Sequence, residues 1–319
     1  MRAAVVDNGG APEALRIVSL PEPRPGPADV LIRVEAISLE GGDLADRQQG
    51  RTSYPAVMGY AAAGKIIEVG RDVEKFRAGQ RVATFAFSGS HADLRVAPAA
   101  TTFAVPDGVD IGVAAAIPCG PGTAALALSL GRLQPGETVL ITGAAGGVGS
   151  AAIQIAAAKG ARVVGAARSL AHLQTLKDLG LSDLVTIGDS PVEGQVRSIT
   201  GGRGADLLID TIGGHVLLDG LSSLTDGGRA VMVGVIGGFN TPIDTGLLFE
   251  HRLTVTGCFM GPVMSDAGPR ALIEALLQDC ADGRFTVPID ARFALADIVA
   301  AHRQAEKRGR LGRVIVMPV

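Results

Sequence analysis

Residues 137–149 read ETVLITGAAGGVG and carry the clearest indication of the fold. A β-branched run leads into a glycine-rich turn, and an Ala- and Ile-rich stretch from about 147 to 159 predicts a helix. A second apolar run follows at 161–166. A strand, a tight turn, a helix and a further strand form a βαβ unit with parallel strands. The segment therefore predicts part of a dinucleotide-binding α/β domain.

The turn fits the template GxGxxG, with alanine in place of the first glycine. Gly146 lets the backbone approach a pyrophosphate, and Gly149 lets the helix pack closely on the strand. The anion would lie against N–H groups at the helix N-terminus, where the helix dipole favours negative charge. The alternative is a glycine-rich turn without a ligand. We predict that the cofactor-binding turn is formed by Ala144, Gly146, Gly147, Val148 and Gly149.

The end of the second strand indicates which dinucleotide binds. An acidic residue there would bind the ribose 2′-hydroxyl, but the chain reads Gly165-Ala-Ala-Arg168-Ser169. Arg168 offers a planar donor fork for a 2′-phosphate, Ser169 adds a hydroxyl, and His172 lies one turn further. We therefore expect NADPH as the cofactor. The alternatives are a solvated surface charge for Arg168 and a helix-surface residue for His172.

The rest of the chain falls into two patterns. After Pro118, short Val- and Ile-rich runs alternate with helical stretches, which predicts a doubly wound parallel sheet. Residues 1–110 instead hold short strands separated by turns, which predicts a mostly β domain. We therefore predict an α/β protein. The expected domains are 1–117, the first part of the β domain; 118–258, the dinucleotide-binding domain; and 259–319, the return to the β domain.

Composition limits the possible partners and the compartment. Lys and Arg number 29 against 32 Asp and Glu, so no basic excess exists to bind a nucleic acid. Three cysteines form no CxxC pair, which argues against a disulfide framework and favours a reducing compartment. The first ten residues lack a signal-peptide pattern, and proline or glycine interrupts the long uncharged stretches. We expect a cytoplasmic protein that does not enter a membrane.

Two enzyme classes are excluded by their motifs. Short-chain dehydrogenases need a tyrosine followed four residues later by lysine. Met58 and Gly64 stand at that distance from Tyr54 and Tyr60, which are the only tyrosines. No GxxxxGK[ST] motif occurs, so a P-loop nucleotide hydrolase is not supported.

A set of motifs in fixed order carries a family resemblance. The chain resembles the medium-chain dehydrogenase/reductase superfamily along essentially its whole length. The resemblance implies a GroES-like β domain that holds substrate and a Rossmann dinucleotide-binding domain inserted before the C-terminal tail. The matching segments are PEPRPGPADVLIRVEAISL, PAVMGYAAAGKIIEVG, VEKFRAGQRV, IPCGPGTAALAL, LQPGETVLITGAAGGVGSAAIQIAAAKGARV, ADLLIDTIGG and GRAVMVG.

Within this superfamily, the zinc ligands separate the branches. Zinc alcohol dehydrogenases use an early Cys, a Gly-His-Glu motif and a later ligand. This chain has Glu40, Gly59-Tyr60-Ala61 and Cys119 at those places. One carboxylate and one thiol without a histidine do not supply a three-ligand catalytic zinc site, and the cysteine-rich structural lobe is missing. The chain therefore resembles the zinc-independent quinone oxidoreductases and enone reductases, with no metal expected and Cys119 as a small buried residue.

The branch usually carries Asn-x-x-Asp where this chain has Glu40-Gly-Gly-Asp43. We expect burial to raise the pKa of Glu40, or a cation such as Arg47 to pair with it. The alternative is that Glu40 and Asp43 brace a turn. Without a metal, the hydride acceptor must spread charge by conjugation, as quinones and α,β-unsaturated carbonyls do. Tyr60 is the predicted hydrogen-bond donor to the enolate oxygen, with Tyr54 or water as alternatives.

The resemblance also implies further cofactor contacts and an assembly. Thr123 is expected near the nicotinamide, Val233 and Gly234 on the opposite wall, and Arg313 near the cofactor. The superfamily commonly pairs edge strands, and residues 253–259 are apolar and β-branched, so a homodimer is expected.

Three functions remain open from the sequence. The first is an NADPH-dependent reductase of a small-molecule quinone or enone. The second is a metal-dependent alcohol dehydrogenase with an unusual site at Glu40 and Cys119. The third is an NADPH-binding sensor that has lost turnover.

Overall fold

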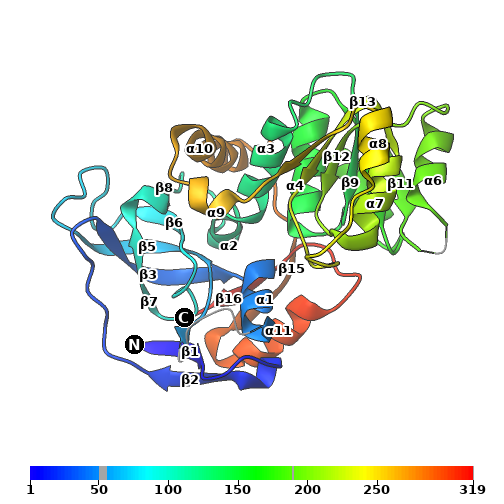
Figure 1. Ribbon diagram of the computed structural model, residues 1–319. Coiled ribbons are helices and arrows are strands. Elements are labelled where there is room, and N and C mark those ends of the chain that lie inside the picture. Colours follow the sequence, from blue (N-terminus) through cyan, green and yellow to red (C-terminus); the bar gives the residue numbers. More distant parts are fainter. Residues whose placement is uncertain (50–55, 189, 319) are drawn as a thin grey trace. The chain divides into compact units, whose positions relative to one another are not determined.

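The structure is a computed structural model that describes residues 1–49, 56–188 and 190–318. The chain divides into two compact units, which Figure 1 traces from blue to red. The first unit comprises Met1–Gly122, Met260–Arg308 and Gly312–Val319, and the second comprises Thr123–Phe259 and Gly309–Leu311. The first break thus falls after Gly122, where 117 was expected, and the second after Phe259, where 258 was expected.

The second unit is built on a parallel sheet with the strand order β11-β10-β9-β12-β13-β14. The chain runs from β9 to one edge and then returns to the other side of β9. This is the doubly wound arrangement, with its switch point at β9 and β12. The strands are β9 (Thr138–Thr142), β10 (Arg162–Ala167), β11 (Asp183–Thr186), β12 (Ala205–Asp210), β13 (Leu224–Met232) and β14 (Thr254–Gly257).

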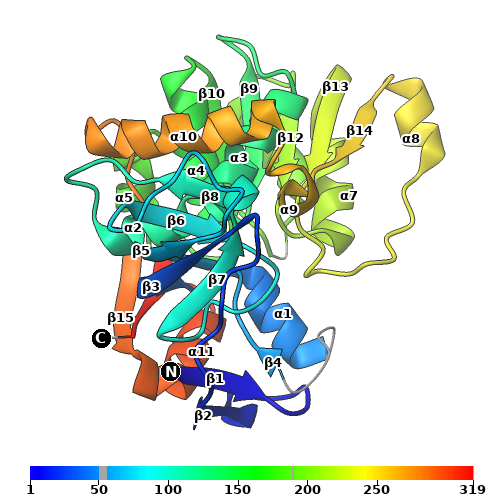
Figure 2. The ribbon, with the colours of Figure 1, turned by 90° about the vertical axis from the view of Figure 1, so that its left-hand side faces the viewer.

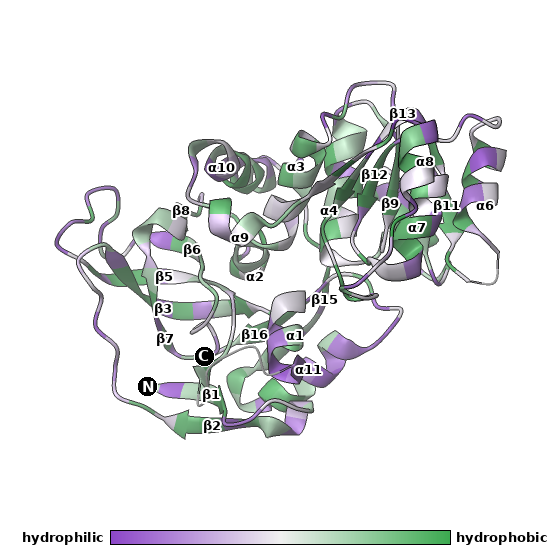
Figure 3. Cartoon of the chain, in the orientation of Figure 1, coloured by the Kyte–Doolittle hydropathy of each residue, from purple (hydrophilic) through white to green (hydrophobic). Residues whose placement is uncertain are grey.

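Helices bury the central strands of this sheet. Every residue of β9 and β12 is buried, and Figure 3 shows both strands in the green of hydrophobic residues. A continuous apolar run is the pattern of a strand covered on both faces, so the predicted Rossmann-type architecture is confirmed. The helices are α3 (Gly120–Leu130), α4 (Gly147–Ala158), α5 (Leu173–Asp178), α6 (Val192–Ile199), α7 (Gly214–Ser222) and α8 (Thr245–Glu250).

Helix α5 is shorter than the sequence suggested. The residue pattern after the second apolar run predicts a helix from Ser169 to Leu179, but α5 begins at Leu173. The Ser169 hydroxyl accepts a hydrogen bond from the Ala171 N–H (3.1 Å). Serine that bonds to nearby backbone competes with helix formation, which delays the first helical turn.

The first unit is mostly β, as predicted for the GroES-like domain. One sheet has the order β15-β16-β3-β5-β6-β8 with β7 paired to β3, and a small sheet has the order β2-β1-β4. The strands are β1 (Arg2–Val6), β2 (Leu15–Ser19), β3 (Asp29–Ser38), β4 (Ala56–Val57), β5 (Ala61–Val69), β6 (Arg81–Phe85), β7 (Leu94–Pro98), β8 (Thr102–Ala104), β15 (Ile289–Ala294) and β16 (Arg313–Met317). The helices are α1 (Gly41–Gln49), α2 (Ile111–Ala116), α9 (Met260–Val263), α10 (Ala267–Ala281) and α11 (Ile298–Glu306).

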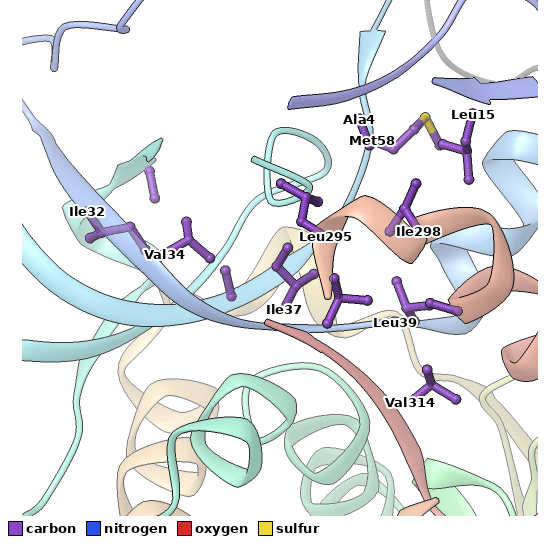
Figure 4. Packing of buried hydrophobic residues seen from close by; sticks show 14 of the residues in the cluster. Ala4, Leu15, Ile32, Val34, Ile37, Leu39, Met58, Leu295, Ile298 and Val314 are labelled. Atoms are coloured by element: carbon purple, nitrogen blue, oxygen red, sulfur yellow. The ribbon is translucent and has the colours of Figure 1, made fainter. Parts of the chain in front are cut away.

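The C-terminal segment completes the first unit. β15 and β16 lie side by side as the orange and red strands of Figure 2, and β16 pairs antiparallel with the end of β3. Figure 4 shows Ile37 of β3 packed beside Leu295 and Ile298, with Val314 of β16 in the same core. Each fully buried side chain of this size contributes about 1.5–3 kcal/mol. This packing holds the start of β16 near the end of β3, where the polar residues described below lie.

Candidate functional site

The glycine-rich turn joins β9 to α4 in the second unit. The Gly146 N–H donates to the Gly143 carbonyl (2.8 Å), and Gly143 has a φ of +65°. A Cβ on Gly149 would lie 2.3 Å from the Gly143 oxygen, so any other residue there would force the turn and helix apart. This close helix–strand packing is the role that the sequence predicted for Gly149. Gly147 and Val148 form the half-buried first turn of α4.

Ala144 is accommodated by a second glycine. Its side chain is fully buried, and its N–H donates to the Ala166 carbonyl of β10 (3.2 Å). A Cβ on Gly165 would lie 2.9 Å from the Ala144 methyl group. Gly165 therefore makes the room that alanine needs at the first position of the template, a compensation that only the paired strands reveal.

The residues predicted to select the dinucleotide follow β10. Arg168 and Ser169 are exposed, and no acidic residue stands between Ala167 and His172. The His172 Nε2 atom donates to the Gly309 carbonyl (2.7 Å). The imidazole therefore carries its proton on Nε2 and holds the 309–311 segment of the second unit. Arg168 and Ser169 are the side chains here that fit a 2′-phosphate.

Val233 and Gly234, which were expected to line the nicotinamide site, contact the backbone of residues 210 and 211. The N–H groups of both residues donate to the Asp210 carbonyl, at 2.7 and 3.3 Å. A Cβ on Gly234 would lie 2.0 Å from the Thr211 oxygen. The neighbouring backbone thus requires glycine at this position, and the placement of Val233 and Gly234 beside a nicotinamide stays a prediction.

A polar group at the switch point was missed by the sequence analysis. The Thr142 hydroxyl donates to Asp210 Oδ1 (2.6 Å), and Asp210 Oδ2 accepts from the Gly213 N–H (2.7 Å). The Thr211 hydroxyl donates to the Thr142 carbonyl (2.8 Å). Burial raises the pKa of Asp210. The sequence did contain a signal for this group: Thr142 and Asp210 end two predicted parallel strands, and ligands bind at the carboxyl edge of such a sheet.

Thr123 lies in the first turns of α3 and is half-buried. Its carbonyl accepts a weak bond from the Cys258 thiol (3.9 Å). Both residues belong to the second unit, the unit that holds the glycine-rich turn.

In the first unit, Glu40 is buried and paired. Arg313 donates to Glu40 Oε2, and the Ser38 hydroxyl donates to Oε1 (2.7 Å). Pairing of Glu40 with a cation was one of the two expectations, and the cation is Arg313; Arg47, the residue offered as an example, pairs with Glu306 instead. The register of β16 on β3 places residue 313 beside residue 40, and no local sequence pattern contains that pairing. Arg313 was predicted near the cofactor; the structure gives its guanidinium the Glu40 carboxylate as a partner.

Asp43 braces the backbone around it. Its Oδ2 accepts from the Glu40 N–H (2.8 Å) and its Oδ1 from the Tyr60 N–H (2.9 Å). Burial raises the pKa of Asp43 to about 8, although both backbone bonds lower it. For Asp43, the bracing role that the sequence left as an alternative is the one that the structure shows.

Tyr60 donates its hydroxyl proton to Asp46. Burial and then this hydrogen bond raise the pKa of Tyr60 well above its ordinary value. A phenol has one proton, so Tyr60 as placed here has none for a substrate oxygen, in contrast to the predicted donor role. Tyr54, the second predicted donor, lies outside the described residues.

The three positions that correspond to zinc ligands do not fit a zinc ion. Both oxygens of Glu40 are hydrogen-bonded, and the Tyr60 hydroxyl is bonded to Asp46. Burial and the nearby Glu40 charge raise the pKa of the Cys119 thiol, and within the described residues this single thiol has no histidine beside it to complete a three-ligand site. Among the described residues, no group of three or more His, Cys, Asp or Glu side chains is placed to hold a metal ion.

Comparison with known families matches both units. A family model described as the alcohol dehydrogenase GroES-like domain covers residues 26–107, and one described as zinc-binding dehydrogenase covers residues 147–278. Within the described residues, no helix is both long and apolar enough to span a bilayer.

Individual relatives cover nearly the whole chain. Quinone oxidoreductase-like protein 2 of Bos taurus is 31% identical over 92% of this chain and 86% of its own length. The quinone oxidoreductase of Pseudomonas aeruginosa is 29% identical over 97% of both chains. The solved structure of a mycobacterial protein, Rv1454c, complexed with NADPH superposes with a TM-score of 0.92, at 30% identity and full coverage of both chains.

Proposed function

The chain belongs to the medium-chain dehydrogenase/reductase superfamily, in its quinone oxidoreductase-like branch, and from this we propose an NADPH-dependent reductase of quinones or α,β-unsaturated carbonyls that works without a metal. The observation that carries the proposal is the state of the three positions where related dehydrogenases hold zinc. Glu40 is paired with Arg313, Tyr60 is bonded to Asp46, and burial raises the pKa of the Cys119 thiol. None of them is left to polarise a carbonyl through a metal ion.

The second unit supplies the residues that would hold NADPH. The turn at 144–149 and the N-terminus of α4 fit the pyrophosphate, because Gly149 brings helix and strand close and the first helical N–H groups attract an anion. Arg168 and Ser169 fit the 2′-phosphate. When bound, the nicotinamide supplies a hydride, so that a quinone takes up two electrons and one proton to become a hydroquinone, with the second proton taken from water.

The first unit limits the kind of acceptor. A simple ketone needs a group that stabilises the developing alkoxide, whereas a quinone or enone spreads this charge by conjugation. Because the Tyr60 proton is bonded to Asp46, we assign protonation of the product to solvent. Of the buried carboxylates nearby in the sequence, Asp43 is bonded to the backbone N–H groups of Glu40 and Tyr60, and Glu40 is bonded to Ser38 and Arg313, so we assign neither of them a proton transfer to the substrate.

A cofactor-consumption screen tests this function. NADPH and NADH oxidation are followed with 1,4-benzoquinone, 2-pentenal and acetone as acceptors, and zinc is measured on the same batch. We expect NADPH oxidation with the quinone or the enal, none with acetone, and less than a tenth of a zinc ion per chain. Tight NADPH binding without turnover would favour the sensor, and one zinc per chain with acetone reduction would favour the alcohol dehydrogenase.

We also propose a homodimer formed through β14. This strand ends the sheet order of the second unit, and its residues are exposed or half-buried. An edge strand with unpaired backbone groups is stabilised by pairing with a second copy. Sedimentation equilibrium should give twice the mass of 32.4 kDa, and a monomer at micromolar concentration would contradict the proposal.

A further inference from the structure

Asp210, the last residue of β12, joins three segments at the carboxyl edge of the parallel sheet. Its Oδ1 atom accepts from the Thr142 hydroxyl at the end of β9 (2.6 Å), and its Oδ2 atom accepts from the Gly213 N–H just before α7 (2.7 Å). Its carbonyl accepts from the N–H groups of Val233 and Gly234, which follow β13. The side chain is fully buried, at the edge where a doubly wound sheet binds its ligand. Asp210 therefore connects three of the segments from which a dinucleotide site is built.

Thr142 carries this connection into the glycine-rich turn. Its hydroxyl oxygen accepts from the Thr211 N–H (3.0 Å), and its carbonyl accepts from the Thr211 hydroxyl (2.8 Å). The next residue is Gly143, and a Cβ there would lie 2.3 Å from Thr211 Oγ1. The Gly143 carbonyl in turn accepts from the Gly146 N–H. The first peptide of the turn is thus held against the end of β12 by side-chain bonds that lead to Asp210.

A second aspartate of β12 shows what is particular to Asp210. Asp206 lies near the amino end of the strand, and its Oδ2 atom accepts from the Thr138 N–H of β9 (2.8 Å). Arg203 neutralises Asp206, whereas Asp210 forms no ion pair within the described part of the chain. A buried carboxylate without a counter-charge is costly, and hydrogen bonds offset that cost here. Both aspartates link β12 to β9, but only Asp210 does so at the edge where the turn begins.

We propose that Asp210 is a positioning residue for the cofactor, and that its carboxylate, acting through Thr142, holds the glycine-rich turn in the shape that accepts a pyrophosphate. The inference rests on the proposed function for the identity of the ligand, and adds to it a residue that acts through another. The pyrophosphate is common to NADPH and NADH, so loss of the carboxylate should weaken the binding of both. Arg168, in contrast, is assigned to the 2′-phosphate, which only NADPH carries.

Fluorescence titrations of Asp210→Asn and two Thr142 variants test the positioning. Asparagine has one acceptor oxygen, so it satisfies either the Thr142 hydroxyl or the Gly213 N–H but not both. We expect the Kd values for NADPH and NADH each to rise about tenfold. Thr142→Val removes the hydroxyl at nearly constant shape and should give the same rise, whereas Thr142→Ser keeps the hydroxyl and should stay within about twofold of the unaltered protein. The two Thr142 variants decide the matter if Asp210→Asn does not fold.

Asp206→Asn is the matched control. It removes a carboxylate from the same pair of strands at the opposite edge, so it should lower the urea midpoint of unfolding and leave both Kd values unchanged. A residue that only stabilises the sheet would behave in this way too. If Asp206→Asn raises both Kd values as much as Asp210→Asn does, or if Asp210→Asn and Thr142→Val raise neither, the inference is overturned.

Hydrogen exchange of the cofactor-free protein separates this inference from the proposed function. The N–H groups of Ala144, Gly146 and Ser150 are hydrogen-bonded in the turn and at the start of α4. Asp210→Asn and Thr142→Val should speed exchange over residues 143–150 about tenfold, and Asp206→Asn should not. If the unaltered protein binds neither nucleotide, the proposed function fails, and faster exchange confined to this segment still supports the positioning role. Unchanged exchange in both variants contradicts that role whatever the ligand.

Discussion

The Nε2 atoms of His91 and His302 lie 3.0 Å apart in the interior of the first unit, where both side chains are fully buried. The Arg47 Nε–H donates to His302 Nδ1 (3.3 Å), so the His302 proton is on Nε2 and is donated to His91. His91 then carries its own proton on Nδ1, which lies 3.2 Å from the Ser90 hydroxyl. The chain of bonds works only with both histidines neutral.

Acid should therefore destabilise the protein through these histidines. Burial, as the main cause, lowers the pKa of His91 to about 3 and that of His302 to about 2. Below an ordinary histidine pKa of about 6.5, the unfolded chain binds protons that the folded chain does not. As the pH is lowered from 8 to 5, the free energy of unfolding should therefore decrease by about 2 kcal/mol per histidine.

Urea denaturation at pH 8 and pH 5 checks this expectation. His302→Gln keeps one hydrogen-bond donor and one acceptor at this position. On going from pH 8 to pH 5, this variant should lose about 2 kcal/mol less stability than the unaltered protein does. Asp43 acts in the opposite sense, because its raised pKa favours the folded state at low pH, but it does so equally in both proteins. The exposed His215→Gln is the control. The same pH dependence in all three proteins would contradict the prediction.

Removing Glu40 alone should destabilise the protein more than removing both Glu40 and Arg313. Both side chains are at least 92% buried, since they are 1% and 8% exposed. Glu40→Gln leaves a buried guanidinium without its counter-charge and should cost about 3–5 kcal/mol. Adding Arg313→Met should recover much of that loss, because no unpaired charge remains.

Thermal and urea unfolding of the single and double variants measure this coupling. The surface pair of Arg16 and Asp7 is the control, since both side chains are about half exposed, at 53% and 46%. Asp7→Asn should leave the midpoint of unfolding essentially unchanged, because solvent screens an exposed ion pair. Additive losses in Glu40→Gln/Arg313→Met would mean that the two side chains do not depend on each other.

Arg168→Ala should weaken NADPH binding without affecting NADH. Loss of a charge-assisted bond to the 2′-phosphate predicts a Kd for NADPH raised about tenfold or more. Fluorescence titration of the reduced nicotinamide gives both constants. Arg24→Ala removes an exposed arginine of the first unit and should leave both unchanged. Equal weakening of NADPH and NADH would remove Arg168 from the 2′-phosphate site.

Tyr60→Phe should retain turnover. The variant keeps the aromatic ring at position 60 and loses only the hydroxyl, whose proton is bonded to Asp46. Since solvent is assigned as the proton source, kcat should change less than about threefold, whereas removal of a true general acid costs about 10²–10⁴-fold. Steady-state kinetics with 1,4-benzoquinone decide the matter, and a loss of a hundredfold would restore Tyr60 as the donor.

Most elements could be read from the sequence because their signals are local. The sequence patterns at 61–69, 138–142 and 313–317 predict strands over those residues, and β5, β9 and β16 have the same bounds. Alternation of apolar residues and the glycine-rich turn depend on neighbours within one or two turns of chain. The helix predicted from Ser169 begins only at Leu173, because the Ser169 hydroxyl accepts a hydrogen bond from the Ala171 N–H. This bond is also local, but a single serine is a weaker sequence signal than a repeated apolar pattern.

Local sequence patterns were enough to predict the two-part α/β fold, the position of the glycine-rich turn and the absence of an acid after β10. Packing between distant segments was needed to show that Arg313 and not Arg47 neutralises Glu40, that His302 contacts His91 from 211 residues away, and that Gly261 leaves space for Phe87. The reason is physical: hydrophobic periodicity records which face of an element is buried, whereas the partner of a buried polar or aromatic group depends on which distant elements are packed against it.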